Sequence, residues 1–382
     1  MNIKKIQRNK DVINGCEDLE YLDKFDDYPV FMGCVNQPFE DDILIDMQWA
    51  ISKNSGIIQL SSVLPLDVLY SEDHGAGVVG TMWLKHHKEF AKFIQKQSPQ
   101  SILEIGGSHG ILSREYKKMS DIDWTILEPN PVPAEDVDAL FIKGFFDDQF
   151  TFNGEIDAIV HSHVFEHVYY PNEFITHISN YLEEGQKLIF SFPNMEEMLK
   201  RKYTNCINFE HTVLLTEPYV DYLLSKHGFR EVDKEYFQDD HSIFYSFIKD
   251  STVETITLSD GLYEHNKKMY LDYVDYHKQL INDLNTKIKN TSDNQNIYLF
   301  GAHVFAQSLI EFGLDTSRIV CLLDNDKNKQ SKRLYGTSML VESPKILKGV
   351  SNPIVILKAG VYNSEISSDI LDNINSHTIF WE

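Results

Sequence analysis

Residues 101–110 read Ser101-Ile102-Leu103-Glu104-Ile105-Gly106-Gly107-Ser108-His109-Gly110. The run from Ile102 to Ile105 shows no alternation of apolar and polar residues, which predicts a parallel strand buried on both faces. The run ends in glycines, and helical spacing resumes at Ile111. A strand, a glycine turn and a helix in this order present backbone N–H groups and a helix N-terminus to a ligand.

The glycine spacing does not fit a dinucleotide fingerprint, because Ser108 and Ile111 stand where G-x-G-x-x-G requires its second and third glycines. The pattern is instead E-x-G-x-x-x-G, which resembles motif I of class I S-adenosylmethionine-dependent methyltransferases. In that family the first glycines let the backbone approach the methionyl part of the cofactor. The residues that this resemblance implies for cofactor binding are Glu104, Gly106, Gly107 and Gly110. A glycine turn without any ligand is the alternative.

A second apolar run, Trp124–Leu127, ends in Glu128, which follows Gly106 by 22 residues (128 − 106). A carboxylate about 20 residues after such a turn, at the tip of the second strand, can accept two hydrogen bonds from a ribose diol. A single acid at a strand end is more often a solvated cap. Together with the glycine turn, Glu128 is predicted to bind the cofactor ribose.

Composition limits the classes of protein that remain. The chain has 382 residues, which predicts two or three domains. A formal net charge of −23 argues against a nucleic-acid partner, although a small substrate remains compatible with it. Four cysteines without a C-x-x-C pair fit a reduced, cytoplasmic setting. We expect neither a signal peptide nor a membrane span, because no long apolar run is present.

Strands alternate with helices through the middle of the chain, which predicts an α/β fold with a doubly wound parallel sheet. A helix expected over about 80–97 carries an apolar stripe of Trp83, Phe90, Phe93 and Ile94. A terminal hairpin would complete a seven-stranded sheet. The expected strands are Ile102–Ile105, Trp124–Leu127, Ala139–Ile142, Ala158–His161, Lys187–Phe192, Glu231–Phe237 and Ser242–Ile248.

Four segments are expected along the chain. They are an N-terminal segment (1–75), a central cofactor-binding domain (76–250), a helical linker (251–293) and a small Rossmann-like C-terminal domain (294–382). The linker carries a packing stripe of Met269, Tyr273, Tyr276, Leu280 and Leu284. The last segment repeats the order of strand, glycine turn and helix at Ile297–Phe312.

The whole chain resembles the sugar C-methyltransferases that act on nucleotide-linked deoxysugars. These proteins combine an N-terminal zinc ribbon, a cofactor domain and a Rossmann-like C-terminal domain. The likeness is carried by the following motifs: the glycine turn, His163-Val164-Phe165-Glu166-His167, Phe209-Glu210-His211, Asp240-His241-Ser242, Leu323-Asp324-Asn325-Asp326 and Leu334-Tyr335-Gly336-Thr337. It implies a nucleotide-activated sugar as the methyl acceptor.

The chain departs from this family in two places. Ser52 and Ser55 stand at zinc-ligand positions, and Cys16 has no partner three residues on. A structural zinc ion requires four Cys or His ligands, so we expect a vestigial ribbon-like segment without zinc. Asn208 stands where the family has a tyrosine, and Val213 and Leu214 replace aromatic residues. These changes raise the question of whether methylation at carbon is retained.

Methyl transfer from a sulfonium is an in-line displacement, and the acceptor must lose a proton before or during attack. Histidine titrates near neutrality and is a natural proton acceptor. The catalytic candidates are His211, Glu210 and His167, which match the family's Glu-His pair and its histidine after strand four. A role in organising the loops is the alternative for His167.

The resemblance and the predicted topology supply further candidates. Phe145 and Phe146 follow the third strand, where the adenine lies in this fold, and His163 is assigned to the cofactor site. The residues assigned to the acceptor are Tyr70, His74, Asn208 and His241. A metal cluster of His161, His163 and His167 is a weak alternative, so no metal is expected. Gly301 and Asp324 are 23 residues apart (324 − 301), but the missing glycines disfavour a second cofactor, such as NAD.

The sequence therefore predicts a cytoplasmic enzyme with S-adenosylmethionine as its cofactor. Its acceptor is expected to be a small polar metabolite, foremost a nucleotide-activated deoxysugar of surface-polysaccharide or secondary-metabolite synthesis. Two alternatives remain: O- or N-methylation of another small molecule, and a non-catalytic protein that retains the cofactor pocket. Neither nucleic acid nor membrane is expected as a partner, and a homo-oligomer is left open.

Overall fold

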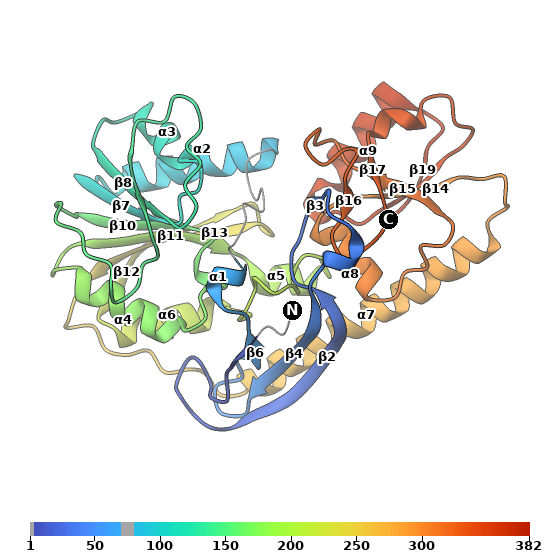
Figure 1. Cartoon of the computed structure of the whole chain (residues 1–382). Helices are drawn as coiled ribbons and strands as arrows, with labels where there is room; N and C mark the ends of the chain where they lie inside the picture. Colours follow the sequence, from blue (N-terminus) through green and yellow to red (C-terminus); the bar gives the residue numbers. More distant parts are fainter. Residues whose placement is uncertain (1–3, 70–79) are drawn as a thin grey trace.

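The computed structural model describes residues 4–69 and 80–382. Figure 1 shows the domain of the seven-stranded sheet on the left, the C-terminal sheet on the right, and the N-terminal strands between them in blue. None of the helices in the described residues has the length and apolar character to cross a membrane. The predicted boundaries of the four segments stay a prediction.

The central domain is built on a seven-stranded sheet in the order β12-β13-β11-β10-β7-β8-β9. Neighbouring strands are parallel except at β13, which is antiparallel to both β11 and β12. The α/β class and the seven predicted strands are confirmed. The strands are β7 (Ser101–Ile105), β8 (Asp123–Glu128), β9 (Leu140–Lys143), β10 (Ala158–Ser162), β11 (Lys187–Pro193), β12 (Phe229–Phe237) and β13 (Ser242–Lys249).

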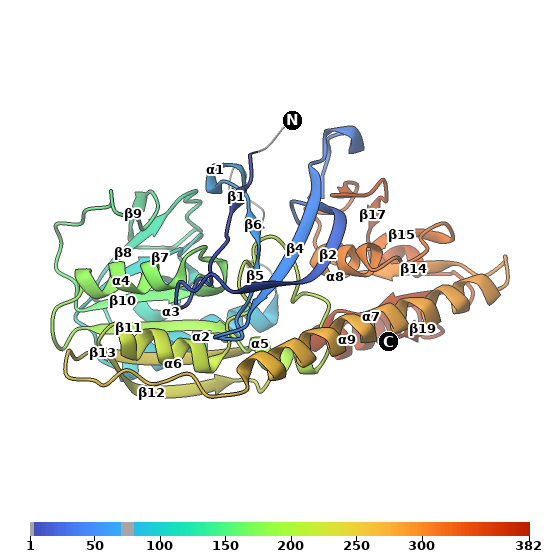
Figure 2. The same ribbon diagram turned by 90° about the horizontal axis from the view of Figure 1, so that it is seen from below.

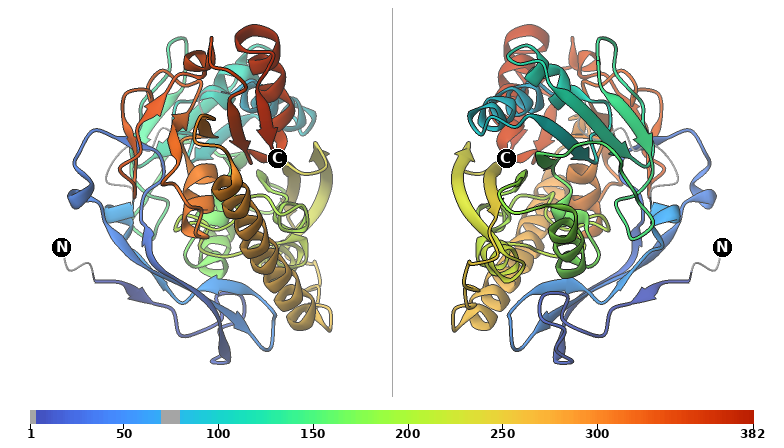
Figure 3. Two further views of the ribbon diagram at one scale, coloured as in Figure 1. Left: turned by 90° about the vertical axis from the view of Figure 1, so that its right-hand side faces the viewer. Right: turned by 90° about the vertical axis from the view of Figure 1, so that its left-hand side faces the viewer.

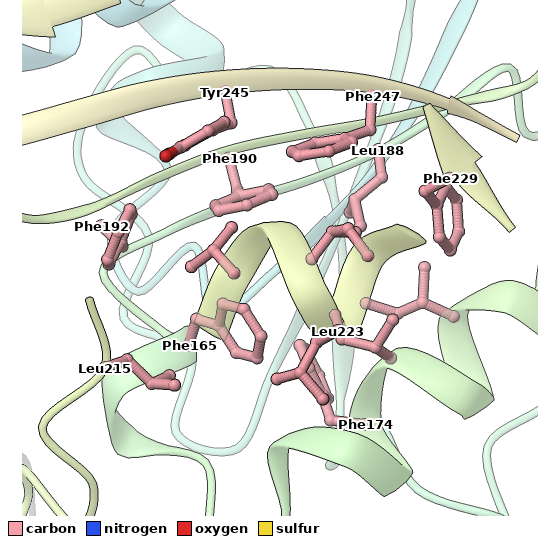
Figure 4. Packing of buried hydrophobic residues seen from close by; sticks show 14 of the residues in the cluster. Phe165, Phe174, Leu188, Phe190, Phe192, Leu215, Leu223, Phe229, Tyr245 and Phe247 are labelled. Atoms are coloured by element: carbon pink, nitrogen blue, oxygen red, sulfur yellow. The ribbon is translucent and has the colours of Figure 1, made fainter. Parts of the chain in front are cut away.

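Helices cover both faces of this sheet because successive strand residues point to opposite sides. Leu188, Phe190 and Phe247 pack against α4 and α6, as Figure 4 shows for this apolar cluster. Ile102 and Ile189 face the other way, toward α2 and α3. The helices of this domain are α2 (Thr81–Lys96), α3 (Ile111–Lys117), α4 (Pro171–Tyr181), α5 (Met195–Lys200) and α6 (Glu217–Lys226), with a 3-10 turn η2 (Phe165–His167) after β10.

The N-terminal segment contains a three-stranded antiparallel sheet in the order β2-β4-β5. Figure 3 shows these strands, in blue, along one flank of the molecule. Its other elements form short pairings: β1 pairs with β6, and β3 pairs with β16 of the C-terminal part. The elements are β1 (Ile6–Gln7), β2 (Leu19–Pro29), β3 (Cys34–Val35), β4 (Leu44–Ser52), β5 (Ile58–Leu60), β6 (Ser62–Val63) and α1 (Leu66–Leu69).

The turn at Ser52 and Ser55, where the resembled family has zinc ligands, is closed by hydrogen bonds of its own. Ser52 is buried, and its Oγ donates to the Asp18 carboxylate. The same carboxylate accepts from the Asn54 N–H, and Ser55 Oγ accepts from the Ile57 N–H. Side-chain oxygens therefore bond to one another and to backbone N–H groups at the place where thiolates would hold zinc in a ribbon. The absence of zinc stays a prediction.

The long helix α7 (Leu262–Asn290) joins the parts of the molecule. Figure 2 shows it extending from near α6 to the C-terminal sheet. Met269 and Tyr273 pack with the N-terminal sheet, and Leu284 packs with the C-terminal core. One member of the predicted stripe was wrong, because Tyr276 is 43% exposed. Besides Met269, Tyr273 and Leu284, the buried face of α7 includes Tyr270, His277, Ile281 and Ile288.

The C-terminal part has a five-stranded parallel sheet in the order β17-β15-β14-β18-β19. Its first strand lies in the middle, so the chain winds outward in both directions. Its elements are β14 (Ile297–Phe300), α8 (Val304–Glu311), β15 (Ile319–Leu323), β16 (Arg333–Leu334), β17 (Val341–Glu342), β18 (Ile354–Leu357), α9 (Asn363–Asp369) and β19 (Ile379–Trp381).

Candidate functional site

A cleft of about 1880 Å³ lies between the central and C-terminal sheets. On the central side it is lined by the loops that follow β7, β8, β9 and β10, and on the other side by the loops that follow β14, β15 and β18. Parallel sheets bind ligands at the carboxyl ends of their strands. The two sheets therefore turn their ligand-binding edges toward one space.

The glycine turn after β7 lines this cleft. Gly106 and Gly110 both have φ of +73°, a conformation that favours glycine. A Cβ at Gly106 would lie 2.7 Å from Val164 Cγ2, and one at Gly110 would lie 2.6 Å from Val137 Cγ1. The protein's own backbone and packing thus require these glycines whether or not a ligand is bound. Gly107 lines the same turn.

Glu128 lies at the tip of β8, beside the glycine turn. Its two carboxylate oxygens accept from the backbone N–H groups of Ser108 at 2.9 Å and Asn130 at 3.0 Å. A carboxylate oxygen has more than one acceptor site, so these bonds leave capacity for a ligand. The carboxylate is fixed in place while its residue lines the cleft.

Glu104 is the second acid of this region and is 2% exposed. Its carboxylate accepts a hydrogen bond from Trp124 Nε1 at 2.7 Å. Burial raises the pKa of Glu104 to about 7, an effect that the Trp124 bond only partly offsets. Glu104 is therefore an acid of the cleft lining whose charge changes near neutral pH.

Phe145 and Phe146 follow β9 and both line the cleft. Phe145 is 38% exposed, whereas Phe146 packs against Phe150, Phe174 and His177. Stacking of either ring on an adenine stays a prediction.

His163 and His241 both line the cleft, and each contacts the Ser242 hydroxyl. His163 Nε2 lies 2.9 Å and His241 Nδ1 2.6 Å from Ser242 Oγ. Burial lowers the pKa of His241 to about 3. Trp83 packs on both rings, with centroids 4.8 Å from His163 and 5.2 Å from His241. The sequence placed Trp83 on an apolar packing stripe, but it lines the cleft instead.

His167 and His211 lie side by side, with ring centroids 5.4 Å apart. His167 Nδ1 is 2.9 Å from the Glu210 carbonyl oxygen, and His211 Nδ1 is 3.0 Å from the Cys206 carbonyl oxygen. A carbonyl only accepts, so Nδ1 carries the hydrogen in each ring. Each Nε2 is left as the nitrogen available in the cleft. Burial lowers the pKa of His211 to about 4.

Asn208 shapes the loop that carries His211. Its side-chain oxygen accepts from the N–H groups of Glu210 and His211, both at 2.8 Å. Asn208 is buried and lines the cleft, so contact with an acceptor stays a prediction. Tyr70 and His74, the other residues assigned to the acceptor, lie outside the described residues.

Sequence reasoning gave no role to Glu166, although the His163–His167 motif contains it. Glu166 is 1% exposed, and its Oε1 lies 3.1 Å from His163 Nδ1 and 3.8 Å from His167 Nε2. Burial acts to raise its pKa, but the His163 bond and the nearby histidines outweigh burial and hold the pKa at about 2.

Arg8 was also missed. Its guanidinium is buried and donates to the carbonyl oxygens of Leu60, Tyr169 and Thr212. Tyr169 follows the loop of His167, and Thr212 follows His211, so Arg8 ties both loops to the N-terminal segment. Burial lowers its pKa to about 10. Backbone acceptors leave no trace in a sequence, and no motif could have revealed this contact.

The alternative metal cluster of His161, His163 and His167 does not form among the described residues. The ring of His161 stacks on Phe190 inside the sheet core, with centroids 4.8 Å apart. Neither of its nitrogens has a hydrogen-bond partner in the described part of the chain. His161 is a core residue.

The second glycine turn, at Gly301, lies on the opposite wall of the cleft, together with Asp324 and Lys329. The Ala302 N–H donates to Asp324 Oδ2 at 3.0 Å, and Lys329 Nζ lies 3.1 Å from the same oxygen. The turn and its acid therefore satisfy each other. The absence of a second cofactor at this turn stays a prediction.

Comparison with known proteins bears on the central domain. Residues 82–234 match the family model described as a methyltransferase domain. This segment is a class I S-adenosylmethionine-dependent methyltransferase domain. Its cofactor is S-adenosylmethionine. No curated protein matches the chain.

Among solved structures, the chain is similar to several methyltransferases. One is the plantazolicin methyltransferase BpumL in complex with SAH (16% identity, TM-score 0.33, 44% of this chain and 84% of that one). Another is the N-methyltransferase NodS from Bradyrhizobium japonicum (16%, 0.34, 44% and 97%). A third is an O-methyltransferase family protein from Burkholderia thailandensis (13%, 0.36, 44% and 57%).

Proposed function

We propose that the protein transfers a methyl group from S-adenosylmethionine to a small polar metabolite held in the cleft. The proposal rests on one observation: the predicted cofactor-binding residues and two histidines line the same cleft. The Gly106 turn and Glu128 lie at the ends of β7 and β8. His167 follows β10, His211 lies in the loop before α6, and both line the same cleft with Nδ1 bonded to a backbone carbonyl.

The residues present fit the cofactor. Glu128 offers a fixed carboxylate suited to a ribose diol. The cofactor carries a cationic sulfonium and an ammonium group. Acids of the cleft lining, such as Glu104, can attract these positive charges. When bound, S-adenosylmethionine supplies an electrophilic methyl group to an acceptor aligned with it.

The chain's own part is to orient the acceptor and remove its proton. We assign that removal to the group formed by His211, His167 and Glu210. The backbone carbonyls fix both imidazoles as Nδ1–H tautomers, so an acceptor proton can reach an unprotonated Nε2. The Glu210 carboxylate, 3.9 Å from His167 Nδ1, is the nearby acid.

The first candidate acceptor is a nucleotide-activated deoxysugar, which the sequence resemblance suggests. Cleft size supports it, because sites for one drug-sized ligand measure about 300–1,000 Å³. The cleft of about 1880 Å³ offers room for the cofactor and a second ligand of similar size.

The charge of the cleft favours a second candidate, O- or N-methylation of a neutral or cationic metabolite. Among the described lining residues, Lys329 is the only lysine or arginine, and it pairs with Asp324. A diphosphate is normally bound by several cationic side chains or N–H groups. The acids that line the cleft include Glu104, Glu128, Glu166, Glu210, Asp240, Asp324, Asp326, Glu365, Asp369 and Asp372.

Incubation with labelled S-adenosylmethionine and an acceptor panel would test both candidates, with products read by mass spectrometry. The panel pairs nucleotide sugars with the same sugars lacking phosphate and adds amino sugars and simple amines. Methylation of the phosphate-free members alone would exclude the nucleotide sugar. Cofactor binding without any methylated product would favour a non-catalytic binding protein.

Variants at the histidine pair would test the assignment of proton removal. Asn can keep the donor toward the carbonyl that His211 Nδ1 contacts, yet it lacks Nε2. We expect His211→Asn to lower turnover by about 10² or more, the typical contribution of a general base, with cofactor affinity retained. His167→Asn should have the smaller effect. Unchanged turnover in both variants would exclude the pair.

A further inference from the structure

Glu166, His167 and His211 form a compact group in the lining of the cleft. Each offers one ligand atom, and these three atoms lie within 4.8 Å of one another. All three residues line the cleft, and they come from η2 and the loop before α6. Two imidazoles and one carboxylate are a recurrent ligand set for divalent transition metals.

The orientation of both imidazoles matches that of metal ligands. His167 and His211 each donate their Nδ1–H to a backbone carbonyl, of Glu210 and Cys206 respectively. Histidines that bind metals through one nitrogen almost always donate from the other to a carbonyl or carboxylate. This outer contact fixes the tautomer and leaves Nε2 as the ligand atom.

Glu166 supplies an independent observation. Its side chain is 1% exposed, and its Oε1 is close to His163 Nδ1. Its Oε2 is buried and has no hydrogen-bond partner in the described part of the chain. The other oxygen, Oε1, lies 3.8 Å from His167 Nε2. A buried carboxylate oxygen without a partner is costly, and a cation held by the Glu166 carboxylate would offset that cost.

We propose that Glu166, His167 and His211 bind a divalent first-row transition-metal ion. Ligands at about 2.0–2.1 Å from a tetrahedral ion lie about 3.4 Å apart. The three atoms therefore approach one another by side-chain rotation when the ion binds. Three protein ligands leave at least one coordination position open toward the cleft, as in catalytic zinc sites.

The chemical role of the ion rests on the proposed function: the ion would activate the acceptor for methyl transfer. An acceptor hydroxyl bound at the open position would have its pKa lowered by the ion. Its O–H bond would break, and the proton would be released to solvent in the cleft. The oxygen lone pair would then form the O–CH3 bond while the S–CH3 bond breaks and its electron pair stays on sulfur. Without the ion, the Nε2 atoms accept the proton directly.

Cobalt(II) is a suitable probe because the ion alone reports its coordination through visible absorption. The full-length chain would be treated with a chelator, dialysed and titrated with cobalt(II), without cofactor or acceptor. We expect one ion per chain, with the spectrum of a low-coordinate N2O site. Loss of a residue that only supports a metal ligand weakens metal binding by up to about 100-fold. Glu166→Gln and His211→Asn each remove a direct ligand, so each should weaken cobalt(II) binding by at least about 100-fold.

Two matched controls locate the ion. His303→Asn removes a histidine from the opposite wall of the same cleft, and Ser52→Ala removes the hydroxyl that bonds Asp18 in the N-terminal segment. Both should bind cobalt(II) like the parent. Circular dichroism would show that each variant is folded, and His211→Asn serves if Glu166→Gln does not fold.

Failure to bind one ion, or equal binding by the parent and by folded His211→Asn, would overturn the proposed site. Calorimetry with S-adenosylmethionine keeps this result separate from the proposed function. If the chelated protein binds the cofactor and methylates an acceptor at the full rate, the proposed function is retained. A role for the ion in methyl transfer is then excluded. A protein that binds cobalt(II) but not the cofactor would support the metal site and exclude the proposed function.

Discussion

Glu128 is the residue on which the cofactor assignment depends most directly. Its carboxylate is already oriented by two backbone N–H groups, so it need not reorganise to meet a ribose. We expect Glu128→Ala to raise the Kd for S-adenosylmethionine at least about tenfold, because each charge-assisted bond contributes about 1.5–3 kcal/mol. Isothermal titration calorimetry would measure the change. Asp369→Ala, an acid on the opposite wall, is the control for general loss of charge. Glu128→Ala binding the cofactor like the parent would contradict the assignment.

Glu104 should make stability depend on pH. Burial raises its folded-state pKa to about 7, above its value in the unfolded chain, so the folded state holds the proton more tightly. Its contribution to stability is full below about pH 4.5 and is lost as pH rises toward 7. Relative to Glu104→Gln, the parent should lose up to about 3 kcal/mol between pH 5 and pH 8. Denaturant unfolding of both proteins at the two pH values would test this. A constant difference would show that Glu104 does not titrate in this range.

At the scale of elements, the two glycine turns use the same local device. Ser108 donates its N–H to Glu128 at the tip of the next strand, and Ala302 donates to Asp324 in the same way. This contact alone cannot separate a turn that binds a cofactor from one that does not. Lys329 makes the difference, because it pairs with Asp324, whereas none of the ion pairs found in the described residues involves Glu128.

Arg8 connects a short N-terminal element to the two histidine loops and acts as a positioning residue. Arg8→Met would leave the carbonyls of Leu60, Tyr169 and Thr212 without this donor, at about 1–3 kcal/mol for each acceptor left unpaired. We also expect turnover to fall by up to about 10²-fold, with cofactor affinity unchanged, because small displacements of reacting groups are costly.

Arg8→Lys is the matched control, because it keeps the charge and some of the donors. It should recover part of the turnover. Thermal unfolding, cofactor calorimetry and turnover would be measured on all three proteins. A loss of stability with normal turnover in the folded variants would limit Arg8 to a purely structural role.

At the scale of the whole molecule, a buried ion pair joins the N-terminal segment to the C-terminal part. Arg333 binds both carboxylate oxygens of Asp42 at 2.6 Å, with the Arg333 side chain 10% and the Asp42 side chain 0% exposed. Arg333→Met would leave a buried carboxylate without its main counter-charge, which costs about 3–5 kcal/mol. Denaturant unfolding would measure the loss, and small-angle scattering would show whether the two sheets separate.

The double variant Asp42→Leu with Arg333→Met provides the control for this pair. Removing both partners should destabilise the protein less than the two single changes added together. Additive losses would mean that the two side chains do not stabilise the molecule as a pair.

The sequence by itself determined the central sheet. The apolar runs at 102–105 and 124–127 predicted β7 and β8, and the glycine turn and Glu128 were placed at one edge, where the structure joins them through Ser108. These features are local, since a buried parallel strand and a tight turn each restrict the residue types that can form them. They were sufficient for the fold and for the cofactor.

The tertiary structure alone decided the rest of the site. His167 and His211 are separated by more than 40 residues along the chain, and only packing of the two loops brings their rings together. Glu166 became a candidate ligand only because it is buried beside the histidines. Arg8 bonds backbone carbonyls, which every residue possesses. Trp83 lines the cleft because of the direction in which α2 faces it. The acidic lining of the cleft likewise arises from segments of both sheets. Side-chain burial and long-range contact depend on the packed whole, so no local pattern could have encoded them.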